Sequence, residues 1–224
     1  MDDVVNHSVV AERVATLRTR MNDLSGGRSV ELVAVTKGFG PDAIAAALSC
    51  GCRSIGESYA QELRDKFRRL TAHALAPEVH FIGQLQRNKV RMIAPLVHVW
   101  QSVDRDSLAT EIARHVAAAR VFVQVDITGE AGKAGCPPQQ VPDLVEHCRG
   151  LGMQVEGLMT VGPTNGDVTV TRMCFRTVRR LANELQLENC SMGMSGDLDI
   201  AIEEGSTHVR VGTAIFGERP RREL

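Results

Sequence analysis

Short apolar runs alternate along the chain with segments in which apolar residues recur every three or four positions. The runs are rich in Val, Ile and Leu and predict buried strands, at residues 30–37, 53–58, 78–85, 98–104, 120–128, 154–162, 188–196 and 208–217. The segments between them predict helices, at residues 41–51, 59–70, 88–96, 105–119, 137–152, 167–186 and 197–205. One further helix, at about residues 9–24, precedes the first strand.

Strands that alternate with helices are typical of βα units and a parallel sheet. Eight such strands in 224 residues predict an α/β fold, a single (β/α)8 TIM-type barrel with an extra N-terminal helix. An open doubly wound sheet is the alternative. No Pro/Gly/Ser-rich linker and no change of composition divides the chain, so residues 1–224 are expected to form one domain.

The composition is that of an ordinary globular chain, with 43% hydrophobic and 24% charged residues. The net charge of −1 provides no field that would attract nucleic acid or an anionic membrane. No apolar run approaches the ~20 residues that cross a bilayer, and the acidic N-terminus lacks the features of a signal peptide. We therefore expect a cytoplasmic protein with neither nucleic-acid nor membrane partners.

The six cysteines form no CxxC pair and lie mostly in apolar surroundings. They are expected to be reduced packing residues, as is usual in the cytoplasm. Their spacing gives no support for a zinc site, and no metal ligands are assigned.

Candidate chemistry comes from the carboxyl ends of the predicted strands, where the active sites of such barrels lie. Lys37 stands where the first strand ends, and an ammonium there is costly unless it is used or reaches solvent. The last two strands lead into SMGMSGD and RVGTAIFG, whose amides and hydroxyls suit a phosphate, although such residues are common in any turn. A Schiff-base lysine with a phosphate site suggests either pyridoxal 5′-phosphate (PLP) or a phosphosugar aldolase.

Other polar and aromatic residues allow more than one interpretation. Glu57, Gln61 and Glu62 form either a polar network at the site or helix-start carboxylates that favour the helix dipole. His80, within the third strand, is expected to be a hydrogen-bonded core residue rather than a ligand. Trp100, the only tryptophan, is expected in core or lid packing.

Seven motifs follow one another in order from about residue 31 to residue 219: VAVTKGFGPDAI, GESYAQE, HFIGQLQRNK, QSVDR, VQVDITGEAGKAG, GLMTVGP and SMGMSGDLDIAIEEGSTHVRVGTAIFG. The series resembles the YggS/PROSC family of PLP-binding proteins, the PLP homeostasis proteins, over nearly the whole chain. The resemblance implies the barrel of fold-type III PLP proteins, similar to the N-terminal domain of alanine racemase.

The resemblance also implies which residues hold the cofactor. Lys37 matches the lysine that forms the Schiff base, and Arg210 matches an arginine at the cofactor. Further positions match residues around the cofactor, the last three at its phosphate: Met159, Met192, Gly193, Ser195, Gly212 and Thr213. Ser58 stands where the family commonly has an asparagine that reaches the cofactor, and a shorter side chain leaves room for a water. The loop TKGFGP also departs from the common SKTKP.

The function that the resemblance implies is binding of PLP as a Schiff base with Lys37, in intracellular PLP homeostasis and without evident catalytic turnover. The expected partners are PLP and PLP-dependent apo-enzymes, and the chain is expected to be a monomer. A PLP enzyme such as an amino-acid racemase is the alternative, and a lysine-dependent aldolase is a third. A racemase of this fold takes a second acid/base from a second domain, which a chain ending at Leu224 is expected to lack. Arg210 near the ring nitrogen would weaken carbanion chemistry, which favours binding over catalysis.

Overall fold

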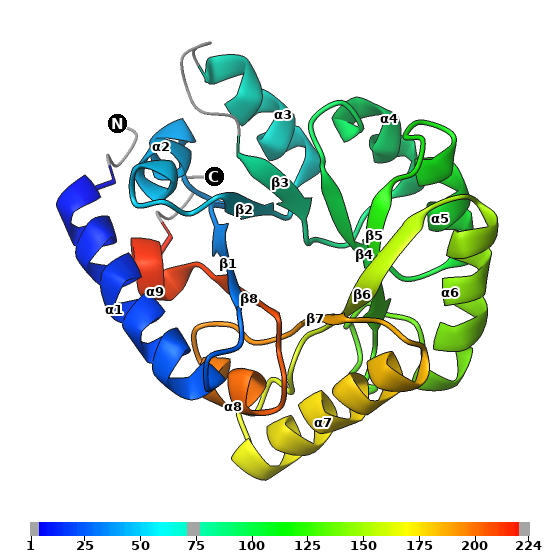
Figure 1. Ribbon diagram of the computed structural model, residues 1–224. Coiled ribbons are helices and arrows are strands. Elements are labelled where there is room, and N and C mark those ends of the chain that lie inside the picture. The colour runs from blue at the N-terminus through cyan, green and yellow to red at the C-terminus, as the bar shows by residue number, and fades with distance from the viewer. Residues whose placement is uncertain (1–4, 71–76, 220–224) are drawn as a thin grey trace.

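Parallel strands form a closed barrel in the computed structural model, which describes residues 5–70 and 77–219 (Figure 1). The strands are β1 (Glu31–Val35), β2 (Ser54–Glu57), β3 (Glu78–Phe81), β4 (Val99–Val103), β5 (Arg120–Val125), β6 (Gln154–Thr160), β7 (Asn189–Ser191) and β8 (His208–Val211). Each strand pairs with the next along the chain, and β1 pairs with β8 to close the ring. The predicted barrel is confirmed over the described residues. Residues 1–4 and 220–224, on which the expectations about a signal peptide and the chain's end partly rest, lie outside them.

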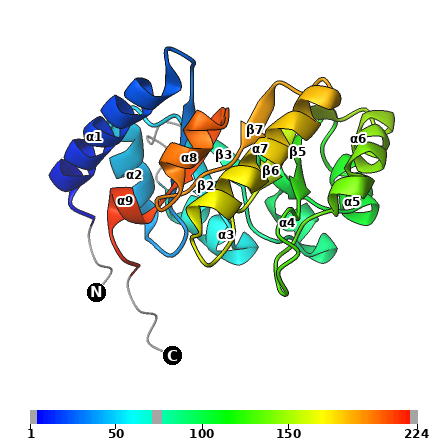
Figure 2. The same ribbon diagram turned by 90° about the horizontal axis from the view of Figure 1, so that it is seen from below.

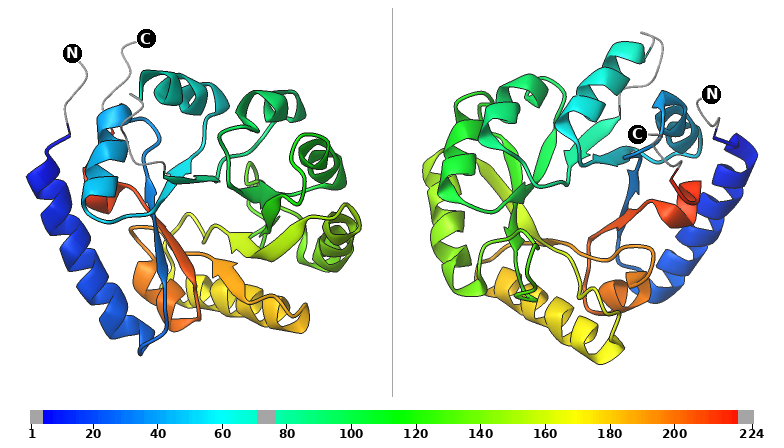
Figure 3. Two further views of the ribbon diagram at one scale, coloured as in Figure 1. Left: turned by 45° about the horizontal axis from the view of Figure 1, so that its top comes forward. Right: turned by 180° about the vertical axis from the view of Figure 1, so that it is seen from behind.

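Helices surround the ring of strands, as the view from behind also shows (Figure 3). They are α1 (His7–Ser25), α2 (Pro41–Ser49), α3 (Ala60–Arg69), α4 (Val90–Ile93), α5 (Asp106–Ala113), α6 (Val141–Gly150), α7 (Val168–Glu184), α8 (Leu198–Glu203) and α9 (Thr213–Phe216). Two short 3-10 turns, η1 (Arg87–Lys89) and η2 (Pro138–Gln140), precede α4 and α6. Each connection between neighbouring strands therefore carries a helix, which is the arrangement that parallel neighbours require.

Several predicted elements are shorter in the structure, and two differ most from their predicted boundaries. The strand predicted for residues 208–217 ends at Val211, and α9 follows it. The carbonyl oxygen of Gly212 accepts hydrogen bonds from the N–H groups of Ile215 and Phe216, both at 2.9 Å, so the chain turns helical as soon as the β8 pairing ends. The helix predicted for residues 105–119 ends at Ala113, and the φ of 49° at Ala118 is incompatible with a right-handed helix.

The extra N-terminal helix is present and packs against the outside of the barrel. Asn6 caps α1 through hydrogen bonds from two backbone N–H groups, and Gly26, with φ of 60°, ends it. The buried residues recur at helical spacing and pack with α2, α8, β8 and α9: Val10, Val14, Leu17 and Met21. Figures 1 and 2 both show α1 beside α2 and α9. Because each such side chain contributes about 1.5–3 kcal/mol when fully buried, this face stabilises the closing β1–β8 edge.

The strands separate an outer apolar core from a mixed interior. Trp100 and Leu158 belong to the large cluster that the helices cover, so Trp100 is a core residue. Val99, Phe122 and Met159 form a separate small cluster, and the alternation of side chains along a strand puts Val99 on the opposite face from Trp100. Buried polar side chains from several strands share the interior with this cluster and lead to the site.

Candidate functional site

A cavity of about 260 Å³ lies at the carboxyl ends of β1 and β8. It brings together five of the predicted site residues: Lys37, Ser195, Arg210, Gly212 and Thr213. Pairing of β1 with β8 explains why residues from opposite ends of the chain meet here. Met194, Gly196 and Gly217, which belong to the two predicted donor-rich segments, also line it. The sequence analysis missed the rest of the lining: Val35, Phe39, Ile82 and Arg219.

Lys37 is half-buried, two residues beyond the last residue of β1. Burial lowers the pKa of its ammonium, and the positive charges of Arg219 and Arg210 lower it further, against the opposing effect of Glu57 and Glu62. No hydrogen bond joins the ammonium to another residue that the structure describes. A lysine with a lowered pKa is a better nucleophile near neutral pH, so this amine is poised to react with a carbonyl compound.

Arg210 provides a fixed positive charge in the cavity wall. Its side chain is buried, and its two terminal nitrogens donate hydrogen bonds to Ser191 Oγ and to the carbonyl oxygen of Thr160, both at 2.7 Å. Burial lowers the pKa of Arg210 to about 10, which still leaves the guanidinium protonated at neutral pH. The charge is therefore permanent, and two contacts fix its orientation.

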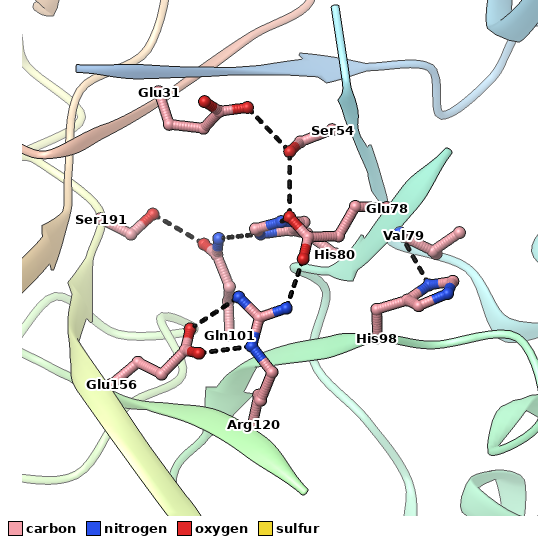
Figure 4. Close-up of polar contacts among 10 residues, drawn as sticks. All are labelled: Glu31, Ser54, Glu78, Val79, His80, His98, Gln101, Arg120, Glu156 and Ser191. Atoms are coloured by element: carbon pink, nitrogen blue, oxygen red, sulfur yellow. Dashed lines mark hydrogen bonds and ion pairs between the residues drawn. The ribbon is translucent and has the colours of Figure 1, made fainter. Parts of the chain in front are cut away.

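A chain of hydrogen bonds continues from Ser191, the hydrogen-bond partner of Arg210, across the barrel interior, and Figure 4 shows it from Ser191 onward. Ser191 Oγ donates to Gln101 Oε1 at 2.6 Å, and Gln101 Nε2 lies 2.6 Å from His80 Nδ1. Because a guanidinium only donates, Ser191 accepts from it and the Gln101 amide must point its oxygen toward Ser191. Gln101 then donates to His80, and the remaining His80 nitrogen, 3.1 Å from Glu78 Oε2, carries the proton. His80 is thus a partnered core residue, as expected.

The chain ends on an ion cluster inside the barrel (Figure 4). Glu78 accepts from His80 and also pairs with Arg120, and these contacts hold the pKa of the Glu78 carboxyl far below its usual range. Arg120 pairs in addition with Glu156, and Ser54 Oγ donates to Glu78 at 3.3 Å. Each group in this chain therefore donates a hydrogen bond to the next, from Arg210 in the cavity wall to the Glu78 carboxylate, which stays ionised.

The loops after β7 and β8 meet at the other wall of the cavity. The Met194 N–H donates to Asp197 Oδ1 at 2.6 Å, which closes the turn that carries Ser195 and Gly196. The Ala214 N–H donates to Ser195 Oγ at 3.3 Å and so joins this turn to the start of α9. Ser195 and Thr213 thus line the cavity together with Arg210, and hydroxyl and guanidinium donors suit an anion.

Four predicted site residues lie away from the cavity lining. Met159 packs in the small interior cluster, and Met192 is fully buried in the main core. Gly193, with φ of 96°, lies in the turn after β7, where a Cβ would be only 2.5 Å from that of Ala201. Ser58 is half-buried after β2, and its carbonyl oxygen would lie 2.2 Å from a Cβ at Gly83. Contact of these four residues with a bound group stays a prediction.

Phe39 and Arg219, which the sequence analysis did not identify, shape the rim of the cavity. The rings of Phe39 and Phe216 lie 5.3 Å apart between centroids, which ties the loop after β1 to α9. A Cβ at Gly38 would lie 2.9 Å from Arg219 Cδ, so the Arg219 side chain crosses the loop that carries Lys37. Phe39, an aromatic residue between two glycines in KGFGP, was the one sequence signal for the contact between Phe39 and Phe216.

Metal sites, disulfides and membrane-spanning helices are absent from the part of the chain that the structure describes. No group of three or more His, Cys, Asp or Glu side chains there is arranged to hold a metal ion. All six cysteines are free, five of them buried. No described helix combines the length and the apolar character that crossing a bilayer requires.

The fold and the site define a barrel of the alanine racemase class. The family model described as "Alanine racemase, N-terminal domain" matches residues 5–220. Relatives called pyridoxal phosphate homeostasis protein include one from Vibrio cholerae, 40% identical over 203 residues, which are 85% of this chain and 86% of the relative. The relative of that name from Homo sapiens is 37% identical over 210 residues, 84% of this chain and 76% of the relative. The chain belongs to this family of pyridoxal phosphate homeostasis proteins.

Solved structures agree with this assignment. A protein from Bifidobacterium adolescentis matches with a TM-score of 0.87 at 34% identity, over 96% of this chain and 97% of its own. PipY of Synechococcus elongatus, solved with PLP bound, matches with a TM-score of 0.82 at 32% identity, over 93% of this chain and 100% of its own. Alanine racemase from Corynebacterium glutamicum, at 17% identity and a TM-score of 0.70, shares the fold over 98% of this chain and 63% of its own.

Proposed function

We propose that this protein binds PLP in the cavity at the carboxyl ends of β1 and β8 and acts in intracellular PLP homeostasis. One observation carries the proposal: a half-buried amine with a lowered pKa shares a cavity with a buried guanidinium and two donor-rich loops. The name shared by the relatives and the PLP-bound structure of PipY support the same ligand.

The lining of the cavity suits the chemical groups of PLP. When bound, the cofactor supplies an aldehyde that condenses with a primary amine, and Lys37 provides that amine. The hydroxyls of Ser195 and Thr213, with the backbone amides of their loops, suit the phosphate. Phe39 and Ile82 provide apolar surface for the ring. Lys37, Ser195, Arg210, Gly212 and Thr213 are therefore the residues that we assign to the cofactor.

Arg210 is assigned to the ring nitrogen of the cofactor. Its guanidinium stays charged and disfavours a second positive charge beside it, so the nitrogen stays unprotonated. An unprotonated ring withdraws electrons poorly, and carbanion chemistry depends on that withdrawal. The hydrogen-bond chain behind Arg210, through Ser191, fixes the orientation of its guanidinium. This arrangement favours holding PLP over turnover.

A measurement of α-hydrogen exchange distinguishes binding from catalysis. We expect the PLP-loaded protein, incubated with L-amino acids in deuterated water, to exchange the α-hydrogen far more slowly than the ~1–10³ per second of typical enzymes. Proton NMR follows the exchange, and chiral chromatography follows the D-isomer. Exchange or racemisation in the enzyme range, abolished by Lys37→Ala, would replace the proposal with the racemase alternative.

We also infer the recipients of PLP, the compartment and the oligomeric state. The recipients of PLP are PLP-dependent apo-enzymes, which the name of the relatives supports, since homeostasis requires delivery as well as storage. The compartment is the cytoplasm, which the free and mostly buried thiols support. The chain acts as a monomer, which light scattering of the purified protein tests.

A further inference from the structure

A buried ammonium lies beside the loop that carries Lys37. Lys66, on α3, is only 4% exposed, and an ammonium so deeply buried is costly unless it is paired. Its nitrogen contacts three oxygens: the carbonyl oxygen of Thr36 and Glu57 Oε1, both at 2.6 Å, and Glu62 Oε1 at 2.8 Å. One of these acceptors is thus the backbone of the residue that precedes Lys37.

The same two carboxylates also hold the loop directly. Thr36 Oγ1 donates to Glu57 Oε1 at 2.6 Å, and the Gly38 N–H donates to Glu62 Oε1. The residues immediately before and after Lys37 are therefore both tied to one cluster, formed by Glu57, Glu62 and Lys66. Glu57 and Glu62 therefore belong to a polar network beside the site, as one of the two interpretations expected, and Gln61 is exposed. Glu62 also lies in the first turn of α3, as the other interpretation expected.

Stability alone is a poor explanation for this cluster. Replacing a buried ion pair by well-packed apolar residues is often neutral or stabilising. Here the Lys66 ammonium contacts both carboxylates, and Glu57 Oε2 is buried without a hydrogen-bond partner among the described residues. Burial raises the pKa of the Glu57 carboxyl, so keeping it ionised has a cost. A costly arrangement beside the loop that carries the reactive lysine is typical of a functional role.

The cluster also influences the charge on Lys37. Four charged groups act on the Lys37 ammonium: Glu57 from β2, Glu62 from α3, Arg210 from β8 and Arg219 from the segment after α9. The two carboxylates favour the ammonium, while the two arginines and burial favour the neutral amine. Only the neutral amine can attack an aldehyde.

We infer that Glu57, Glu62 and Lys66 are positioning residues for Lys37, which fix its loop from both sides and set the pH at which its amine becomes reactive. The inference rests on the proposed function and extends it to residues outside the cavity lining. It separates two contributions, one of position and one of charge, and a different variant tests each.

Lys66→Met tests position. It removes the donor to the Thr36 carbonyl and to both carboxylates. We expect the rate of covalent attachment of PLP, compared at a pH where the Lys37 amine is neutral in both proteins, to fall about 10- to 100-fold, as misplaced reactive groups do. Pyridoxine 5′-phosphate carries an alcohol in place of the aldehyde, so its affinity should not change. Arg64→Met, on the same helix and paired with exposed Asp65, is the matched control and should change neither.

Glu62→Gln tests charge, and it does so even if Lys66→Met fails to fold. The amide oxygen can still accept from Gly38 and Lys66, while one negative charge near Lys37 is lost. Loss of that charge lowers the pKa of the Lys37 ammonium, so more of it is neutral at a given pH. We expect the midpoint of the attachment rate against pH to fall by about one unit, with Arg64→Met unchanged.

Opposite results overturn the inference in distinct ways. An unchanged midpoint in Glu62→Gln removes the charge contribution. If Lys66→Met loses affinity for PLP and for pyridoxine 5′-phosphate equally, Lys66 has only a role in folding. If Lys66→Met attaches PLP at the parent's rate, Lys66 does not position Lys37. A parent protein that forms no linkage with PLP refutes the proposed function and the inference together.

Discussion

Arg210 and Lys37 show how single residues determine what the cavity can do. Arg210 can only donate, so every hydrogen bond behind it has one orientation, and the guanidinium keeps its charge. Lys37, facing that charge, is pushed toward its neutral and nucleophilic form. The positive charge of Arg210 is therefore permanent, whereas that of Lys37 depends on pH. This asymmetry suits a protein that captures an aldehyde and does not then stabilise a carbanion.

Replacing Thr213 tests the assignment of its hydroxyl to the phosphate of PLP. Thr213→Ala removes a hydroxyl donor to a charged acceptor, a contact that contributes about 1.5–3 kcal/mol. The affinity for PLP, measured by equilibrium titration of the apo-protein, should fall by roughly 10- to 150-fold. Pyridoxal lacks the phosphate and should bind equally to the variant and the parent. If both ligands lose affinity to the same extent, the hydroxyl acts on folding and does not contact the phosphate.

The loops after β7 and β8 set the geometry of the cavity. A turn closed by Asp197 presents Ser195, and a four-residue helix begins at Thr213 where the β8 pairing ends. So short a helix contributes backbone amides more than an aligned macrodipole. Gly193 sets the exit of β7, because its positive φ and its closeness to Ala201 leave no space for a side chain.

Gly193→Ala tests this element. The added Cβ would lie 2.5 Å from that of Ala201 in a backbone conformation that alanine rarely adopts, so the free energy of unfolding should fall by about 1–3 kcal/mol. Gly196→Ala is the matched control, because no atom lies within 4 Å of the Cβ added there, and its change should stay within about 0.5 kcal/mol. Urea unfolding of the apo-proteins measures both. Equal stability of the two variants would show that the turn is not constrained as described.

The whole molecule shows which features a sequence can predict. Alternating strands and helices predict the closed barrel, and strand ends predict the lysine and the two donor loops, because these features depend on local pattern and topology. The sequence does not predict the place of Arg219 at the cavity, the Phe39–Phe216 contact or the pairing of Lys66 with Glu57 and Glu62. Each depends on how segments from different elements pack. The strand predicted through residue 217 failed because an apolar run does not reveal where pairing ends.

The most direct test of the central claim is to locate the covalent attachment of PLP. Apo-protein saturated with PLP is reduced with borohydride, digested, and analysed by mass spectrometry for the modified lysine. We expect the adduct on Lys37 and none in Lys37→Ala, although the fold of the variant, judged by circular dichroism, is unchanged. An adduct found only on Lys89 or Lys133, or equal labelling of the parent and Lys37→Ala, would show that Lys37 is not the attachment site.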